Sequence, residues 1–318
     1  MYFPYLRGKQ YELLALKELS GLLGDQQRVV PIIEPVRSPA GSGLDRCLIA
    51  LMDAEVDFVL ALNPSVGELR TPLVAPDLAD YLSQQDRSAA WNVGLLVDEN
   101  TDVNALIASY RSTVDTKQRR LTLIHRGVAN GLDELPALTS DLRRAFDVID
   151  DRWRPRYFRD LLATSGGVTL RDGFPVEERN SAYLSKVESV FTDDHLFYAE
   201  ENWYGFSDYV TIGEPYSDGG FTPRAVAIHW TYEPQTGGPV MIRHFTSESN
   251  GDTSNVGGKF LEAVDKLVAF LDTHDIHTQA SEVMRAHAAN RTYPGLGIVK
   301  KLSIQNHLEL MSGILSRS

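Results

Sequence analysis

Polar side chains that could bind or act on a ligand stand directly after a series of short apolar segments along the chain. They comprise three carboxylates, three cations, one amide and one imidazole, each at the end of such a segment. In chain order these residues are Arg7, Lys9, Glu34, Asn63, Asp98, His125, Arg126 and Asp150. The spacing matters because the ends of parallel strands meet at one surface, which would bring distant residues together.

The carboxylates predict a metal site if they converge. Glu34, Asp98 and Asp150 would repel one another in a partly dry pocket unless a divalent cation compensated them, and oxygen ligands suit magnesium or manganese. Asp150 is also a candidate catalytic carboxylate, with His125 as the proton carrier. The hypothesis is therefore a cofactor of the Mg or Mn type at this surface.

The cations and the amide predict the ligand-binding part of the same site. Arg7, Lys9 and Arg126 suit a phosphate or carboxylate group, and Asn63 could orient a ligand through hydrogen bonds. A structural interpretation stands beside this one. Polar residues are expected wherever a chain leaves a sheet, because loop backbone and helix N-termini need hydrogen-bond partners.

The segments that must position these residues have the pattern of repeated strand–helix units. Runs rich in β-branched residues alternate with polar turns and with apolar residues at helical spacing. The predicted strands are residues 2–6, 29–36, 58–62, 93–97, 121–124, 146–149, 168–170 and 209–212. Continuous apolar runs indicate strands buried on both faces, which is typical of a parallel sheet.

The fold class predicted from this rhythm is α/β, a (β/α)8 TIM-like barrel with an added β-hairpin and C-terminal helices. An open doubly wound sheet fits the same pattern, but the unit count and the lack of a Gly-rich loop after the first strand favour the barrel. We expect the barrel in residues 1–220, with the hairpin and helices of residues 221–318 packed on it. His229 and His244 stand on the two arms of the hairpin, where a structural role is expected.

The composition limits the classes of partner. The formal charge of −12 argues against bulk nucleic-acid binding, and a single cysteine, Cys47, excludes an internal disulfide or a cysteine-based metal cluster within one chain. No signal segment or apolar run of membrane-spanning length is present, so a cytoplasmic location without membrane contact is expected. P-loop, nucleophile-elbow, zinc-protease and dinucleotide motifs are also missing.

Several motifs together resemble the phage-type "beta protein" family and its bacterial relatives. They are residues 2–12, 31–36, 205–209, 227–229 and 243–245. The resemblance implies a barrel-like fold and an antiviral-defence context, and carries over no catalytic residues. Three functional interpretations stay open. The chain is a metal-assisted hydrolase of a phosphate-containing ligand, a non-catalytic sensor or subunit with a small anionic ligand or a protein partner encoded nearby, or a scaffold without a ligand.

Overall fold

The chain divides into two compact units in a computed structural model that describes residues 1–39, 41–84, 91–153, 166–219 and 222–317. The barrel unit comprises Met1–Arg171 and Phe197–Asp208, and the hairpin unit comprises Asp172–Leu196 and Tyr209–Ser318. The boundary expected between residues 220 and 221 falls outside the described residues. The observed division differs from it, because residues 172–196 and 209–219 group with the hairpin unit.

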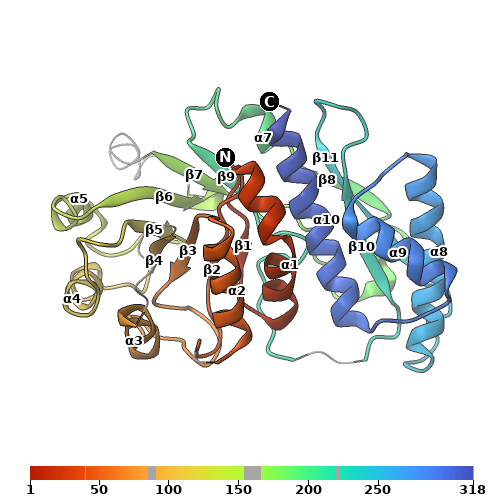
Figure 1. Ribbon diagram of the computed structural model, residues 1–318, viewed down its shortest axis with the longest axis horizontal. Helices are drawn as coiled ribbons and strands as arrows, with labels where there is room; N and C mark the ends of the chain where they lie inside the picture. The colour runs from red at the N-terminus through yellow and green to blue at the C-terminus, as the bar shows by residue number, and fades with distance from the viewer. Residues whose placement is uncertain (40, 85–90, 154–165, 220–221, 318) are drawn as a thin grey trace. The chain divides into compact units, whose positions relative to one another are not determined.

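The barrel unit is built on eight parallel strands, which confirms the predicted α/β (β/α)8 TIM-like fold (Figure 1). The sheet order is β1-β2-β3-β4-β5-β6-β7-β9, and each strand pairs with its neighbours in parallel. The strands are β1 (Tyr5–Leu6), β2 (Ile32–Ile33), β3 (Phe58–Ala61), β4 (Trp91–Val97), β5 (Leu121–His125), β6 (Arg144–Asp150), β7 (Gly167–Leu170) and β9 (Gly205–Ser207).

The first and last strands of the sheet are joined by backbone hydrogen bonds. The amide of Phe3 donates to the carbonyl of Phe206 at 2.9 Å, and the amide of Tyr5 donates to the carbonyl of Asp208 at 2.8 Å. The eighth strand predicted at residues 209–212 was wrong. Residues 209–213 form a turn, in which the amides of Ile212 and Gly213 both approach the carbonyl of Tyr209, so β9 takes that place.

Helices lie outside the strands of the barrel, as expected for strand–helix units (Figure 1). They are α1 (Gln10–Gln26), α2 (Gly43–Asp53), α3 (Pro76–Ser83), α4 (Val103–Thr113) and the short α5 (Leu135–Leu138). Ser42 and Asp102 cap α2 and α4 by accepting backbone hydrogen bonds, and Pro76 begins α3. These capping residues are the types that helix N-termini prefer.

The hairpin unit contains a three-stranded antiparallel sheet in the order β10-β11-β8. The predicted hairpin is confirmed as β10 (Ala227–Tyr232) and β11 (Val240–Thr246), and its register places His229 opposite His244. The third strand, β8 (Glu188–Thr192), was not predicted. It pairs antiparallel with β11 and is followed by the short helix α7 (Asp194–Phe197).

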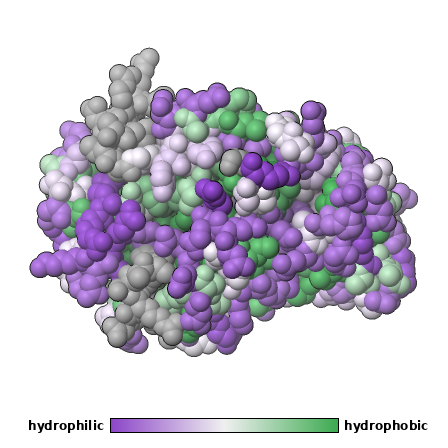
Figure 2. All heavy atoms as spheres, turned by 45° about the horizontal axis from the view of Figure 1, so that its top comes forward, coloured by the Kyte–Doolittle hydropathy of each residue, from purple (hydrophilic) through white to green (hydrophobic). Residues whose placement is uncertain are grey.

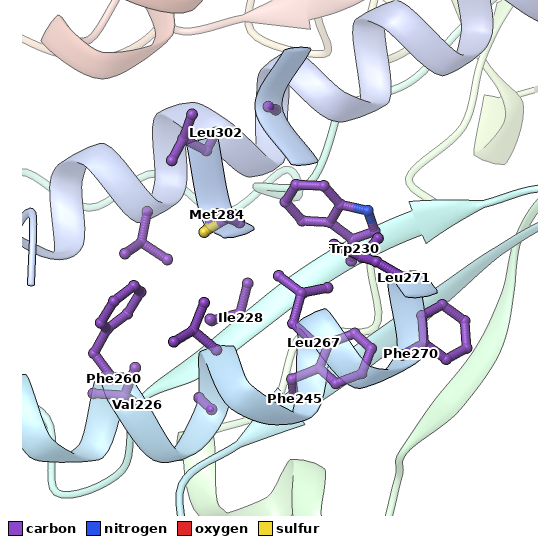
Figure 3. Packing of buried hydrophobic residues seen from close by; sticks show 14 of the residues in the cluster. Val226, Ile228, Trp230, Phe245, Phe260, Leu267, Phe270, Leu271, Met284 and Leu302 are labelled. Atoms are coloured by element: carbon purple, nitrogen blue, oxygen red, sulfur yellow. The ribbon is translucent and has the colours of Figure 1, made fainter. Parts of the chain in front are cut away.

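Three C-terminal helices complete the hairpin unit, as predicted: α8 (Val256–Thr273), α9 (Gln279–Ala289) and α10 (Leu296–Ser316). Their apolar faces form one core with β10 and β11 around the fully buried Trp230 (Figure 3). Leu267 of α8, Met284 of α9 and Leu302 of α10 belong to the same core. Burial of these apolar and aromatic side chains stabilises the sheet.

The surface shown in Figure 2 is mainly hydrophilic, with hydrophobic side chains in scattered patches. Scattered apolar residues are normal for a protein surface and need no partner to explain them. Within the described part of the chain, none of the helices combines the length and the hydropathy that crossing a membrane would require.

Candidate functional site

The carboxyl ends of the barrel strands define the barrel mouth, where seven of the eight predicted site residues stand. His125 and Asp150 are the last residues of β5 and β6. Arg7, Glu34, Asp98 and Arg126 directly follow β1, β2, β4 and β5, and Asn63 lies two residues beyond β3. Topology alone therefore brings them to the same end of the barrel, as the sequence predicted.

Glu34 lies at the centre of a buried hydrogen-bond network. Its Oε2 accepts from the hydroxyl of Tyr5 at 2.7 Å and from Nη1 of Arg7 at 2.9 Å. Its Oε1 accepts from the amide and from the hydroxyl of Ser65, both at 2.7 Å. Nη1 of Arg126 donates to the same hydroxyl at 3.2 Å. We call Tyr5, Arg7, Glu34, Ser65 and Arg126 the Glu34 network.

Burial imposes a desolvation cost on the ion pair of Arg7 and Glu34. The side chain of Glu34 is 0% exposed and that of Arg7 is 7% exposed. A buried ion pair offsets its desolvation cost only when further hydrogen bonds satisfy the remaining lone pairs. Glu34 meets that condition on both oxygens, so its carboxylate is committed to these protein donors.

The loop after β3 places Ser65 against Glu34. Gly67 has a φ of 79°, and a Cβ at this position would lie 2.6 Å from the carbonyl oxygen of Val36. Only glycine combines this backbone conformation with so close an approach. The amide of Glu68 then donates to the carbonyl of Val36 at 2.9 Å, which fixes the loop to the segment after β2.

Beside the Glu34 network lies a cavity of about 380 Å³, which we call the mouth cavity. Ser65 belongs to both the network and the cavity wall. The lining residues come from the ends of β3 and β4 and from the loops that follow: Asn63, Pro64, Ser65, Arg70, Thr71, Pro72, Leu96, Asp98, Asn100 and Thr101. The lining residues include Asp98 and Arg70, and the described part of the chain provides no ion pair for Arg70.

Asn63 and Asp98 line the mouth cavity but also hold the backbone. Asn63 donates through Nδ2 to the carbonyl of Leu96 at 2.9 Å and accepts at Oδ1 from the amide of Leu96 at 2.8 Å, so it ties β3 to β4. Asp98 accepts at Oδ1 from the amide of Asn100 and from the hydroxyl of Thr101. Its Oδ2 is the oxygen through which it could contact a ligand.

Asp150 and His125 each bond to a neighbouring protein side chain. Asp150 accepts from the amide and the guanidinium of Arg152, with Nη2 to Oδ2 at 2.5 Å. Nε2 of His125 lies 3.0 Å from Oδ1 of Asp147, and both side chains are fully buried. Asp147 also accepts two hydrogen bonds of 2.5 Å from Arg144. Because strand residues alternate in direction, His125 and Arg126 point to opposite faces. The catalytic role of His125 stays a prediction.

The predicted metal centre is not assembled. Glu34, Asp98 and Asp150 each bond to separate protein donors, and among the described residues no three His, Cys, Asp or Glu side chains form a group suited to a metal ion. Two of the predicted anion-binding residues have protein partners. Arg7 pairs with Glu34. Half-buried Lys9 is the N-cap of α1, and its carbonyl accepts hydrogen bonds from the amides of Glu12 and Leu13.

The two hairpin histidines form a second cluster of titratable groups, in the hairpin unit. Nδ1 of His229 lies 2.7 Å from Nδ1 of His244, and the ring of Tyr183 packs against both. Burial, with smaller contributions from His244 and Lys300, lowers the pKa of His229 to about 3. Burial and the charge of Lys186 lower the pKa of His244 to about 4. Neutral rings in an aromatic setting agree with the structural role expected for them.

Sequence reasoning missed three residues of the mouth: Tyr5, Ser65 and Arg70. Tyr5 had a usable signal, because it stands two residues before Arg7 and so shares its strand face. Ser65 and Arg70 lie in an irregular loop, where the sequence has no periodicity that would predict their direction.

Comparisons with known proteins add no further constraint: neither a family model, nor a curated protein, nor a solved structure matches the chain. The resemblance to the phage-type "beta protein" family therefore stays a prediction, and the assignment of function depends on the geometry of the site.

Proposed function

We propose that the barrel is a non-catalytic binding module, whose mouth cavity receives a small polar ligand with an anionic group. The cavity of about 380 Å³ falls in the range of roughly 300–1,000 Å³ that is common for small-molecule sites. Arg70 would contact the anionic group, because a guanidinium binds carboxylate or phosphate through paired hydrogen bonds. Asp98 would accept from a donor elsewhere on the ligand.

The observation that carries this proposal is the rigid support beside the cavity. Ser65, Asn63 and Thr101 are each fixed by hydrogen bonds to the Glu34 network, to β4 or to Asp98. A site whose wall is already ordered loses less entropy when it binds a ligand. A hydrolase that uses Glu34 and Asp150 as metal ligands would first have to break their present bonds, so the binding interpretation needs fewer changes.

The biological setting is proposed on the family resemblance alone: a subunit or sensor of a defence-type module, together with a protein encoded nearby. Co-purification with the product of a neighbouring gene tests that setting. Persistence of the complex in an Asp98→Asn variant would show that the partner does not depend on the mouth cavity. Failure to recover any neighbouring product would remove the setting and leave the ligand site to be judged separately.

Isothermal titration calorimetry with inorganic phosphate, small carboxylates and amino acids tests the ligand site. Arg70→Gln should weaken binding of the anionic ligand at least tenfold. Arg37→Gln is the matched control, because Arg37 carries the same charge in the same unit but lies outside the cavity lining and pairs with Glu68 at 3.2 Å. Equal weakening by the two variants, or no binding by the wild type to any member of the panel, would overturn the proposal.

A further inference from the structure

The hairpin unit contains a larger cavity, of about 850 Å³, which shares no lining residue with the mouth cavity. Three segments line it: residues 178–181 before β8, residues 222–225 before β10, and the loop between β11 and α8. Leu296, the first residue of α10, completes the wall. We call it the arginine cavity, after Arg179 and Arg224 in its lining.

Hydrogen bonds hold the three segments together. Nδ2 of Asn180 donates to the carbonyl of Ala225 at 2.9 Å. Asn180 follows Arg179 and Ala225 follows Arg224, so this bond links the two segments that carry the arginines. The amide of Val226 donates to the hydroxyl of Ser247 at 3.0 Å, and that hydroxyl in turn donates to Asn250. The walls are therefore positioned before any ligand arrives.

Buried Lys259 fixes the remaining loop. Its side chain is 2% exposed, and its Nζ donates to the carbonyl of Asp252 at 2.6 Å. This bond anchors the loop that carries Thr253 into the cavity wall. A hydrogen bond from a buried charged donor stabilises this one conformation of the loop.

The charge of the cavity wall differs from that of the chain as a whole. Its charged lining residues are Arg179, Arg224 and Glu178, and within the described residues neither arginine has an ion-pair partner. Two guanidiniums against one carboxylate make a locally basic surface on a chain of net charge −12. Such a surface favours a compact anion over an extended polyanion, which the overall field repels.

We infer that the arginine cavity binds a phosphorylated polar small molecule. The arginines would contact the phosphate, for which a planar guanidinium is well suited. The hydroxyls of Ser181, Thr222 and Thr253 would face the polar remainder of the ligand. These hydroxyls, together with the side chain of Asn250 in the same wall, suit a polyhydroxylated ligand such as a sugar phosphate.

Titration with glucose 6-phosphate, glucose and inorganic phosphate tests this inference. The wild type should bind the sugar phosphate more tightly than phosphate and should not bind glucose measurably. Arg179→Gln and Arg224→Gln should each weaken sugar-phosphate binding at least tenfold. Arg291→Gln is the matched control: it removes the same charge from an exposed arginine of the same unit that pairs with Asp265 at 2.7 Å.

The outcomes separate this site from the mouth cavity. Binding that Arg70→Gln weakens and Arg179→Gln leaves unchanged would place the phosphate in the barrel and overturn the inference. Absence of binding by the wild type at millimolar ligand, or equal loss in the Arg291→Gln control, would also overturn it. Circular dichroism of each variant checks the fold, which substitutions at these exposed arginines should preserve.

Discussion

Removal of the Glu34 carboxylate should destabilise the barrel strongly. Glu34→Ala leaves four donors without their acceptor: the Tyr5 hydroxyl, the Arg7 guanidinium, and the amide and hydroxyl of Ser65. Breaking a buried ion pair by removing one partner typically costs about 3–5 kcal/mol, because a buried charge is left uncompensated. The free energy of unfolding should fall by that amount.

Urea unfolding followed by far-UV circular dichroism measures the effect. The control is Glu68→Ala, which removes the partner of Arg37. Their side chains are 71% and 78% exposed, so the change should cost less than about 1 kcal/mol. In Glu34→Leu, a second change of Arg7→Met should recover stability, since it removes the orphaned charge. Equal losses for Glu34→Ala and Glu68→Ala, or a further loss on adding Arg7→Met, would refute the reasoning.

Three further predictions concern metal binding, pH dependence and the hairpin core. Magnesium or manganese should leave the melting temperature unchanged. A bound metal at 100 times its Kd would add about 2.7 kcal/mol to the free energy of unfolding and raise the melting temperature. A rise that Asp98→Ala abolishes would therefore support the predicted metal site. Burial holds the pKa values of His229 and His244 at about 3 and about 4, so their contribution to the free energy of unfolding should be fully present above their unfolded pKa near 6.5. That contribution should be lost as the pH falls toward 4, with a slope of up to about 1.4 kcal/mol per pH unit for each histidine. Urea midpoints that do not change between pH 5 and 7 would contradict this. Trp230→Ala should cost about 3–5 kcal/mol through the cavity it leaves, whereas Val190→Ala, at a side chain 55% exposed, should change the urea midpoint little.

The strands of the barrel were predictable because burial on both faces requires a continuous run of apolar residues. The runs at β3 and β4 are almost continuously apolar, which is typical of parallel strands covered by helices. The eighth strand has no such apolar run. Gly205–Ser207 contains no β-branched residue, and it joins the sheet through backbone bonds to residues near the N-terminus. That pairing depends on barrel closure rather than on local preference.

The position of the site residues was predictable, but their hydrogen-bond and ion-pair partners were not. Parallel topology alone brings Glu34, Asp98 and Arg126 to one end of the barrel, as the sequence indicated. The bonds of Glu34 depend on a loop conformation that requires Gly67, and no periodic pattern encodes it. The contact of His125 with Asp147 follows from the strand face on which His125 lies, which its place at a strand end does not reveal.

The interleaving of the two units along the chain has a consequence for synthesis. A ribosome releases seven barrel strands by Arg171, but β9 emerges only after residues 172–196 of the other unit. Those residues include β8, which must wait for β11 before it can pair. Until Ser207 has emerged, the nascent barrel exposes the unpaired edges of β1 and β7, which are open to pairing with another chain. Chaperone dependence should therefore be greatest in this interval of translation.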